Sequence, residues 1–298
     1  MNLNQLAQYE IEEEYDKQKI KRNLKNILNT HIQDKILDSL DLVNDYLDTE
    51  YEYASKNVRM TELKEVSMYD VICDVFVSVL WLQYTPIQAV ASSILSYMPH
   101  ELEAHKLKSA CELVTVICGS DVYDIIHARD TEENRIMVKA NFSFDEVTMQ
   151  YISNTMYLPP MLCKPLKVKS NYSSGYLTRD EHIVLGNRMN QHDEYQALDV
   201  INMMNETELC LDTNMLKYEE VPNKPLDTIE KKEAFNRMKL SSRKVYRRIL
   251  DEGNHFWFTW KYDFRGRMYS QGYHISMQGT DFKKSLISLK NKVVIPLD

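Results

Sequence analysis

The stretch FWFTWKYDFRGRMY, residues 256–269, combines a run of aromatic side chains with two arginines that flank a glycine. Its composition predicts extended, β-forming backbone. On such a backbone Arg265 and Arg267 would face the same side, and Gly266 would let another backbone approach closely. Asp263 would share that face and could hold one guanidinium in a bidentate pair. Two fixed guanidiniums beside aromatic rings suit a sugar–phosphate backbone, although a surface strand with a salt bridge explains the same residues.

The charge of the chain is distributed unevenly. The formal net charge is -8, but residues 231–298 carry a balance of +9 and the remaining residues one of -17. A basic cluster of this kind is typical of a phosphate-binding surface. A solvated helix face is the alternative interpretation.

Composition limits the class of protein. Apolar residues make up 44% and charged residues 27%, which predicts a packed globular chain rather than a disordered one. Only 7 glycines and 8 prolines favour long helices over a turn-rich β-sandwich. The 5 cysteines form no CxxC pair, which predicts free buried thiols in a reducing compartment. The acidic N-terminus is no signal peptide, and the apolar run 71–82 is too short to cross a bilayer, so we expect a cytoplasmic protein without a membrane partner.

Apolar spacing predicts a mainly helical α+β fold. A polar tip between two β-prone runs predicts a hairpin over 121–139. Thr85-Pro86 predicts an N-cap followed by proline at the first helical position. The predicted helices cover parts of 1–60, and 67–83, 87–98, 105–116, 141–157, 195–216 and 229–252.

The arginine pair lies within a longer pattern. Phe258-x-x-x-x-Asp263-Phe264-Arg265-Gly266-Arg267-x-Tyr269 is followed by Gln278-Gly279-x-Asp281-x-x-Lys284. This pattern resembles the Asp-x-x-Gly-Arg motif region of phage-type single-subunit DNA-dependent RNA polymerases, the family of the T-odd phage and mitochondrial enzymes. Segments that resemble other parts of the family occur in the family's order, at 85–92, 159–176, 195–216 and 242–256.

The resemblance implies a domain organisation. Residues 1–190 would form a helical N-terminal domain that includes the hairpin 121–139. Residues 191–252 would form a thumb-like helical region, shortened relative to the family. Residues 253–298 would begin a polymerase palm, whose first β-strands another chain would complete.

The resemblance also implies roles for particular residues. The motif arginines would contact the RNA–DNA hybrid and the template. The hairpin would occupy the place of the family's intercalating hairpin, which wedges the upstream edge of the promoter bubble. The implied nucleic-acid contacts are Arg265, Arg267, Tyr269 and Lys284, with Asp263 and Gly266 in support, and the implied wedge residues are Ile125, Ile126 and Ile136.

In the family, the metal-binding aspartates, the catalytic lysine and the nucleotide-selecting tyrosine all lie beyond the position of Asp298. We therefore expect no catalytic residue and no metal on this chain. The chain is similar to the small subunit of the two-chain polymerases of some podoviruses. A large catalytic subunit would supply the fingers, the rest of the palm and the bound Mg²⁺, and DNA template, RNA transcript and a helper that opens or binds single-stranded DNA would be further partners in the bacterial host cytoplasm.

Three alternatives remain open at this point. The first is a standalone phage protein that binds single-stranded nucleic acid through its basic, aromatic C-terminal region. Lone palm strands would leave Trp257, Phe258 and Trp260 without cover, which favours an obligatory partner over that alternative. The other two are a piece of a full-length polymerase and a structural helical adaptor.

Overall fold

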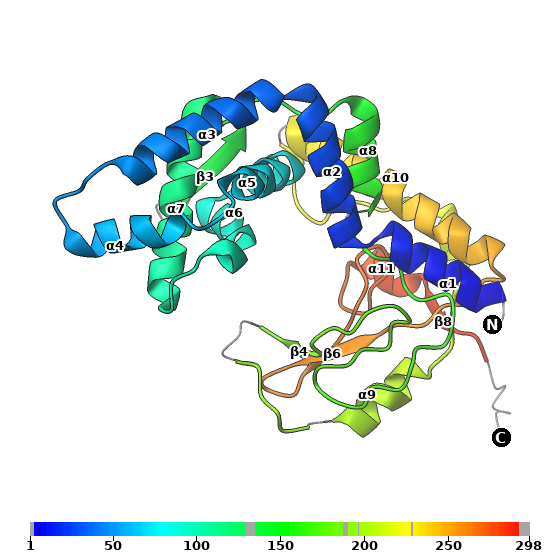
Figure 1. The fold of residues 1–298 in the computed structure, drawn as a ribbon. Helices are drawn as coiled ribbons and strands as arrows, with labels where there is room; N and C mark the ends of the chain where they lie inside the picture. Colours follow the sequence, from blue (N-terminus) through cyan, green and yellow to red (C-terminus); the bar gives the residue numbers. More distant parts are fainter. Residues whose placement is uncertain are drawn as a thin grey trace, which may run out of the picture. The chain divides into compact units, whose positions relative to one another are not determined.

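The computed structural model describes residues 3–128, 135–155, 157–186, 190–195, 197–227 and 229–291. The chain divides into two compact units, one of residues 17–152 and the other of residues 1–16 and 153–298. Helices predominate and the sheets are small, as the expected α+β class requires (Figure 1).

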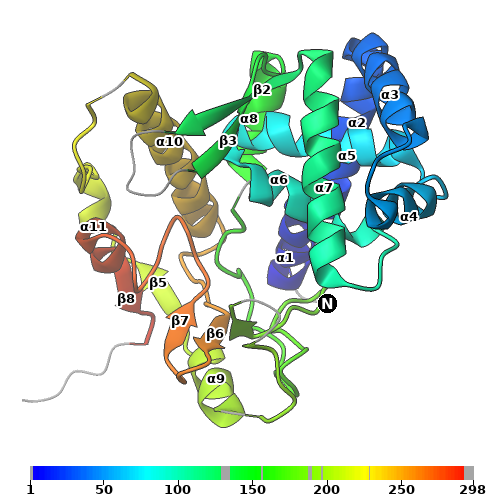
Figure 2. The ribbon, with the colours of Figure 1, turned by 90° about the vertical axis from the view of Figure 1, so that its left-hand side faces the viewer.

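The unit of residues 17–152 is a helical bundle with one small sheet. Figure 2 shows α7 running beside α3 and α6 in this bundle. Its elements are α2 (Lys17–His31), α3 (Gln33–Asp48), α4 (Ala54–Leu63), α5 (Met68–Leu82), β1 (Tyr84–Pro86), α6 (Ile87–Ser93), α7 (Glu103–Ile117), β2 (Tyr123–Ala128), β3 (Arg135–Ala140) and α8 (Glu146–Thr155), of which α8 continues into the other unit.

Helix α5 forms the centre of this bundle. Every residue from Val71 to Leu80 is buried, because α2, α3 and α6 pack around it. The helix ends at Leu82, and its C-cap Gln83 has a positive φ of 58° and an N–H that bonds the carbonyl of Val79. The predicted helix 67–83 is therefore confirmed. The N-cap predicted at Thr85-Pro86 is wrong, since these residues form strand β1 and Pro86 itself is the N-cap of α6.

The predicted hairpin is confirmed as the antiparallel pair β2–β3, and β1 extends it into a sheet of order β1-β3-β2. Val138 faces Thr85 on one side and Ile125 on the other, and it is fully buried. The polar tip, residues 129–134, lies outside the described residues.

The unit of residues 1–16 and 153–298 holds two further sheets. One has the order β4-β6-β7, with β4 parallel and β7 antiparallel to β6, and the other is the antiparallel pair β5–β8 (Figures 1 and 2). Its elements are α1 (Leu3–Glu14), β4 (Val184–Leu185), α9 (Leu198–Asn205), β5 (Leu209–Leu211), α10 (Ile229–Asp251), β6 (Trp260–Asp263), β7 (Met268–Ser270), α11 (Asp281–Ser285) and β8 (Ile287–Leu289).

The long helix predicted over 195–216 is wrong. Helix α9 ends at Asn205, and the chain then forms β5, in which Leu209 pairs with Leu289 of β8. Leu209 and Leu211 are buried and Cys210 between them is not, which is the period of two of a strand. The basic helix predicted over 229–252 is confirmed as α10.

The expectation that Trp257, Phe258 and Trp260 lack cover is also wrong. Their exposed fractions are 9%, 1% and 5%. Phe258 and Trp260 belong to one core with apolar residues of α1, α9 and α10, and Trp257 packs with Met161, Cys163 and Tyr176. Segments far apart in the sequence thus supply the cover that we expected from another chain.

The five cysteines form no disulfide, and Cys73 and Cys163 are buried while the other three are half-buried. Among the described residues, no helix combines the length and the apolar character that crossing a bilayer requires.

Candidate nucleic-acid interface

The motif arginines lie in the turn of a hairpin rather than along a strand. Strands β6 and β7 pair through Tyr262 and Met268, and the chain between them reverses direction. The N–H of Asp263 bonds the carbonyl of Arg267 at 2.9 Å, and the N–H of Gly266 bonds the carbonyl of Asp263 at 2.8 Å. The extended backbone predicted through Arg265 and Arg267 is therefore wrong.

Gly266 has a different role from the one predicted. Its φ is +78°, a conformation that residues with a Cβ rarely adopt, and a Cβ built on it would meet no atom within 4 Å. The glycine allows the chain to turn, and no other backbone approaches it.

The carboxylate of Asp263 organises this turn. Its Oδ1 accepts the backbone N–H of Arg265 at 2.9 Å and that of Arg267 at 3.0 Å. Its Oδ2 accepts the guanidinium of Arg267, with Nε at 2.8 Å and Nη2 at 2.7 Å, and that of Arg265, with Nη2 at 3.2 Å. The hydroxyl of Tyr269 donates to the same Oδ2 at 3.3 Å. One side chain thus fixes both arginines, which is more than the single bidentate pair predicted.

The electrostatics of the turn follow from these contacts. Burial alone would raise the pKa of Asp263, but the hydrogen bonds and the charge of Arg267 outweigh it and hold that pKa below its ordinary value. The bond to Asp263 raises the pKa of Arg267 in turn. Asp263 therefore stays ionised at neutral pH, and the turn carries two positive charges against one negative.

Both guanidiniums remain available to a ligand. The side chains of Arg265 and Arg267 are each 54% exposed, whereas that of Asp263 is 11% exposed. The Cζ of Arg265 lies 5.4 Å from the ring centroid of Phe264, and that of Arg267 lies 5.9 Å from the ring of Tyr269. The turn presents fixed cations beside aromatic rings, which is the arrangement that suits phosphate and stacked bases.

The second part of the motif is partly joined to this hairpin. The Oε1 of Gln278 accepts the N–H and the hydroxyl of Ser270 at the end of β7, at 3.1 and 2.8 Å. Lys284 lies on α11 and pairs with Asp281 at 3.3 Å. No bond or ring contact joins Lys284 to Arg265, Arg267 or Tyr269 in the part of the chain that the structure describes.

The neighbour of Lys284 is the residue that sequence reasoning missed on α11. Lys283 is buried, its Nζ donates to the carbonyl of Tyr273 at 2.6 Å, and burial lowers its pKa. Helix α11 is only five residues long and follows its N-cap Thr280, so its sequence has no periodicity that would indicate that Lys283 faces inward.

The proposed wedge residues belong to the unit of residues 17–152. Ile125 and Ile126 on β2 are half-buried, and Ile136 on β3 is 37% exposed. Ile136 faces His127 across the hairpin, next to the tip. The described part of the hairpin thus has an apolar side chain near its end.

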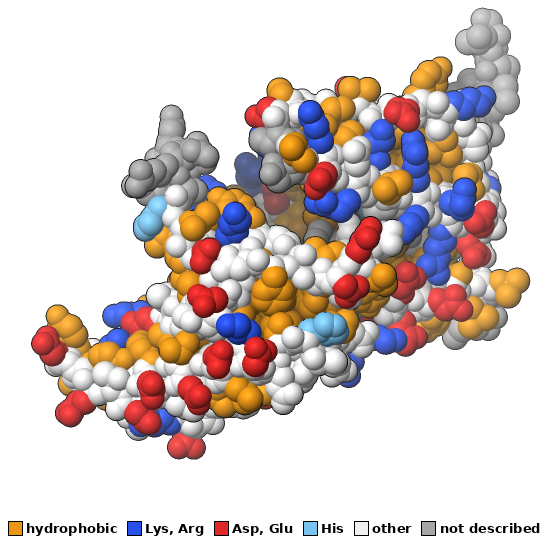
Figure 3. All heavy atoms as spheres, turned by 90° about the horizontal axis from the view of Figure 1, so that it is seen from above, with side chains coloured by type: hydrophobic (Ala, Val, Ile, Leu, Met, Phe, Trp, Pro, Cys, Tyr) orange, Lys and Arg blue, Asp and Glu red, His pale blue; other side chains and the backbone are white. Residues whose placement is uncertain are grey.

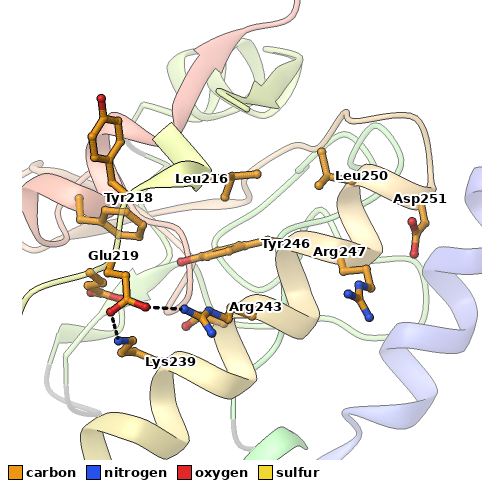
Figure 4. Close-up of a pocket in the computed structure, with 12 residues that line it drawn as sticks. Leu216, Tyr218, Glu219, Lys239, Arg243, Tyr246, Arg247, Leu250 and Asp251 are labelled. Carbon is orange, nitrogen blue, oxygen red and sulfur yellow. Dashed lines mark hydrogen bonds and ion pairs between the residues drawn. The ribbon is translucent and has the colours of Figure 1, made fainter. Parts of the chain in front are cut away.

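A second basic surface follows helix α10, and Figure 3 shows Lys and Arg side chains gathered over it. A pocket of about 490 Å³ lies along this helix (Figure 4). Glu219 pairs with Lys239 at 3.2 Å and with Arg243 at 3.1 Å, and Figure 4 shows Tyr246 between Leu216 and Arg243. Because Glu219 and Glu220 both line this pocket, its cations are largely neutralised, and it offers less net charge than the β6–β7 turn.

Among the described residues, no group of three or more His, Cys, Asp or Glu side chains is placed to hold a metal ion. No family model and no curated protein matches the sequence of this chain.

Proposed function

We propose that this chain is the N-terminal subunit of a DNA-directed RNA polymerase of the phage type. In this proposal a large partner subunit binds Mg²⁺ and carries the catalytic carboxylates. The reaction of the assembly is attack of the RNA 3′-hydroxyl on the α-phosphate of a nucleoside triphosphate. This chain contributes contacts to the RNA–DNA hybrid and the template.

The observation that carries the proposal is the turn between β6 and β7. Asp263 holds Arg265 and Arg267 within hydrogen-bond distance while both guanidiniums stay half exposed. These are the residues of the Asp-x-x-Gly-Arg pattern. A fixed guanidinium loses little conformational freedom when it meets a phosphate, so its binding is stronger than that of a mobile side chain.

One observation favours a second candidate, a standalone protein that binds single-stranded nucleic acid. Trp257, Phe258 and Trp260 are buried within this chain, so the hairpin needs no partner to cover its aromatic side chains. The same turn would serve such a protein without any polymerase subunit.

The two candidates differ in what they bind and what they do. The tagged chain is purified from its native setting, and the preparation is assayed for extension of an RNA primer on a DNA template with Mg²⁺ and nucleotides. The polymerase proposal expects a stoichiometric companion and template-directed extension that the Arg265→Gln, Arg267→Gln double variant impairs although the companion still co-purifies. If the chain binds single strands but has no companion protein and extends no primer, the polymerase proposal is wrong and the second candidate is supported.

A further inference from the structure

The segment of residues 166–180 folds around an open hollow of about 500 Å³ that the motif does not include. Three cations, Lys167, Lys169 and Arg179, and one carboxylate, Asp180, line it. Hydrogen bonds within the segment hold the wall of this hollow in place. The hydroxyl of Ser173 accepts two consecutive backbone N–H groups, those of residues 169 and 170, at 2.9 and 3.0 Å. The hollow is therefore formed before any ligand arrives.

The two lysines of this hollow carry charges that no carboxylate of the described residues pairs with. Both are exposed, and in the described ranges neither ammonium has an ion-pair partner. Lys164, three residues earlier, pairs with Glu206 at 3.3 Å, so carboxylates do reach this part of the surface. Unpaired cations in a preformed hollow favour an anionic ligand.

A series of contacts links the hollow to the β6–β7 turn. The Cζ of Arg179 lies 4.6 Å from the ring centroid of Tyr176, and the Nη2 of Arg179 pairs with Glu181 at 2.9 Å. The other oxygen of Glu181 pairs with Lys261 at 2.8 Å. Lys261 lies on β6 opposite Tyr269 of β7.

Lys261 is also two residues before Asp263, so the two side chains leave the same face of the strand. All these residues belong to the unit of residues 1–16 and 153–298, in which β4 runs beside β6 (Figure 1). Along this path six cations face four carboxylates, which leaves a net charge of about +2 by simple count. The cations are Arg265, Arg267, Lys261, Arg179, Lys167 and Lys169, and the carboxylates are Asp263, Glu181, Asp180 and Glu12, of which Glu12 accepts the N–H groups of residues 177 and 178 in the wall of the hollow.

We propose that the hollow of residues 166–180 binds the sugar–phosphate backbone of the strand that Arg265 and Arg267 contact, farther along that strand. This inference rests on the proposed function, because it extends the path of the same nucleic acid. Lysines act on phosphate as point charges and read no bases, so the contact is independent of sequence. The occupant is a single strand, since spaced cations beside an aromatic ring follow one backbone.

The test is the Lys167→Ala, Lys169→Ala double variant of the whole chain, or of its assembly where one exists. Fluorescence anisotropy measures its affinity for labelled oligothymidylates from about 4 to about 16 nucleotides long, at several salt concentrations. A control with the same change of charge is Lys35→Ala, Lys64→Ala, two ion-paired lysines of the other unit. A thermal melt shows whether each variant is folded.

We expect the variant to bind the shortest oligomer as the wild type does and the longest one several-fold more weakly. Each lost phosphate contact lowers the slope of log affinity against log salt by about 0.7 for a single strand, so the slope falls by about 1.4 with the long oligomer alone. The control keeps the wild-type slope.

Two results would overturn this inference and leave the proposed function intact. In the first, the lysine variant binds long oligomers as tightly as the wild type does, while the Arg265→Gln, Arg267→Gln variant loses affinity. The other is an equal loss at every length, which would place the lysines at the same contact as the arginines. Failure of the wild-type chain or assembly to bind both these oligomers and an RNA–DNA hybrid would instead contradict the proposed function.

Discussion

The carboxylate of Asp263 holds Arg267 at two points, through its backbone N–H at 3.0 Å and through its guanidinium Nε at 2.8 Å. The first bond fixes the turn and the second fixes the side chain. Asp263 therefore determines both the shape of the hairpin turn and the direction of the Arg267 guanidinium.

This double contact predicts the pH range in which the turn is ordered. The pKa of Asp263 is lowered from its ordinary 3.8, so its stabilising contribution is complete above that value and is lost as the pH falls through the lower value of the folded state. The slowly exchanging Nε–H signal of Arg267 in an NMR spectrum should persist at pH 5. In the Asp263→Asn variant it should be absent at the same pH.

Asp281→Asn is the control, because Asp281 is exposed and, among the described residues, has Lys284 as its one ion-pair partner. It should leave the Arg267 signal unchanged. A protected Arg267 signal in Asp263→Asn would show that the carboxylate does not hold the guanidinium.

The burial of the aromatic run predicts that the isolated chain folds cooperatively. Phe258 is 1% exposed, so Phe258→Ala should lower the free energy of unfolding by about 3–5 kcal/mol in urea denaturation. Phe264→Ala, at a side chain 62% exposed, should change it by less than about 0.5 kcal/mol. A loss in Phe258→Ala no larger than that in Phe264→Ala would instead mean that the isolated chain does not form this core.

The contacts of Glu12 on α1 predict that its substitution strongly lowers the free energy of unfolding, although Glu12 lies far from the motif in the sequence. This carboxylate is buried and accepts the N–H groups of Leu177 and Thr178, the hydroxyl of Thr178, and the amide of Gln8. Glu12→Ala leaves these donors without an acceptor and should cost about 2–4 kcal/mol of unfolding free energy.

The exposed Glu10 on the same helix is the matched control, because its oxygen lies 3.9 Å from Arg248 and surface pairs contribute little. Glu10→Ala should change the unfolding free energy by less than about 0.5 kcal/mol. Similar losses in the two variants would exclude Glu12 as the residue that fastens α1 to this unit.

The buried imidazole of His274 predicts that the free energy of unfolding falls in acid. Burial, together with the nearby charge of Lys283, lowers its pKa to about 4 from 6.5, so it is neutral in the folded chain while the unfolded chain binds a proton below 6.5. Its stabilising effect is complete above pH 6.5 and should fall by about 3 kcal/mol as the pH approaches 4.

Urea denaturation of wild type and His274→Gln at pH 7.5, 6 and 4.5, values chosen about the ordinary histidine pKa, measures this effect. The difference between the two proteins should shrink or reverse as the pH falls. A difference that stays constant over this range would show that His274 does not titrate on unfolding.

The sequence predicted those parts of the fold that depend on local periodicity. The apolar run of α5 and the basic helix α10 are each long enough for one period to dominate. The end of α9 was missed because the pairing of Leu209 with Leu289 joins residues far apart in the chain. The place of α1 was missed for the same reason, since Gln8 and Glu12 bond residues 162 and 177–178.

The sequence pointed to Asp263, Arg265, Arg267 and Tyr269, which the structure brings together, but it did not give their geometry, and Lys284 pairs with Asp281 instead. The composition of residues 263–267 pointed to Asp263 and the two arginines, but a strand was expected where Gly266 makes a turn. Lys261 could have been found, because it is two residues before Asp263 on the same strand. Its link through Glu181 to Arg179 depends on the parallel pairing of β4 with β6, which no local pattern indicates.

The central claim is that the guanidiniums of Arg265 and Arg267 bind nucleic acid. The most direct test measures the affinity of an RNA–DNA hybrid at several salt concentrations for wild type, Arg265→Gln, Arg267→Gln and the exposed control Arg22→Gln. We predict that each motif substitution lowers the salt slope by about 0.9, that the thermal melting temperature stays unchanged, and that Arg22→Gln matches wild type. An affinity and a slope unchanged in both motif variants would contradict the account.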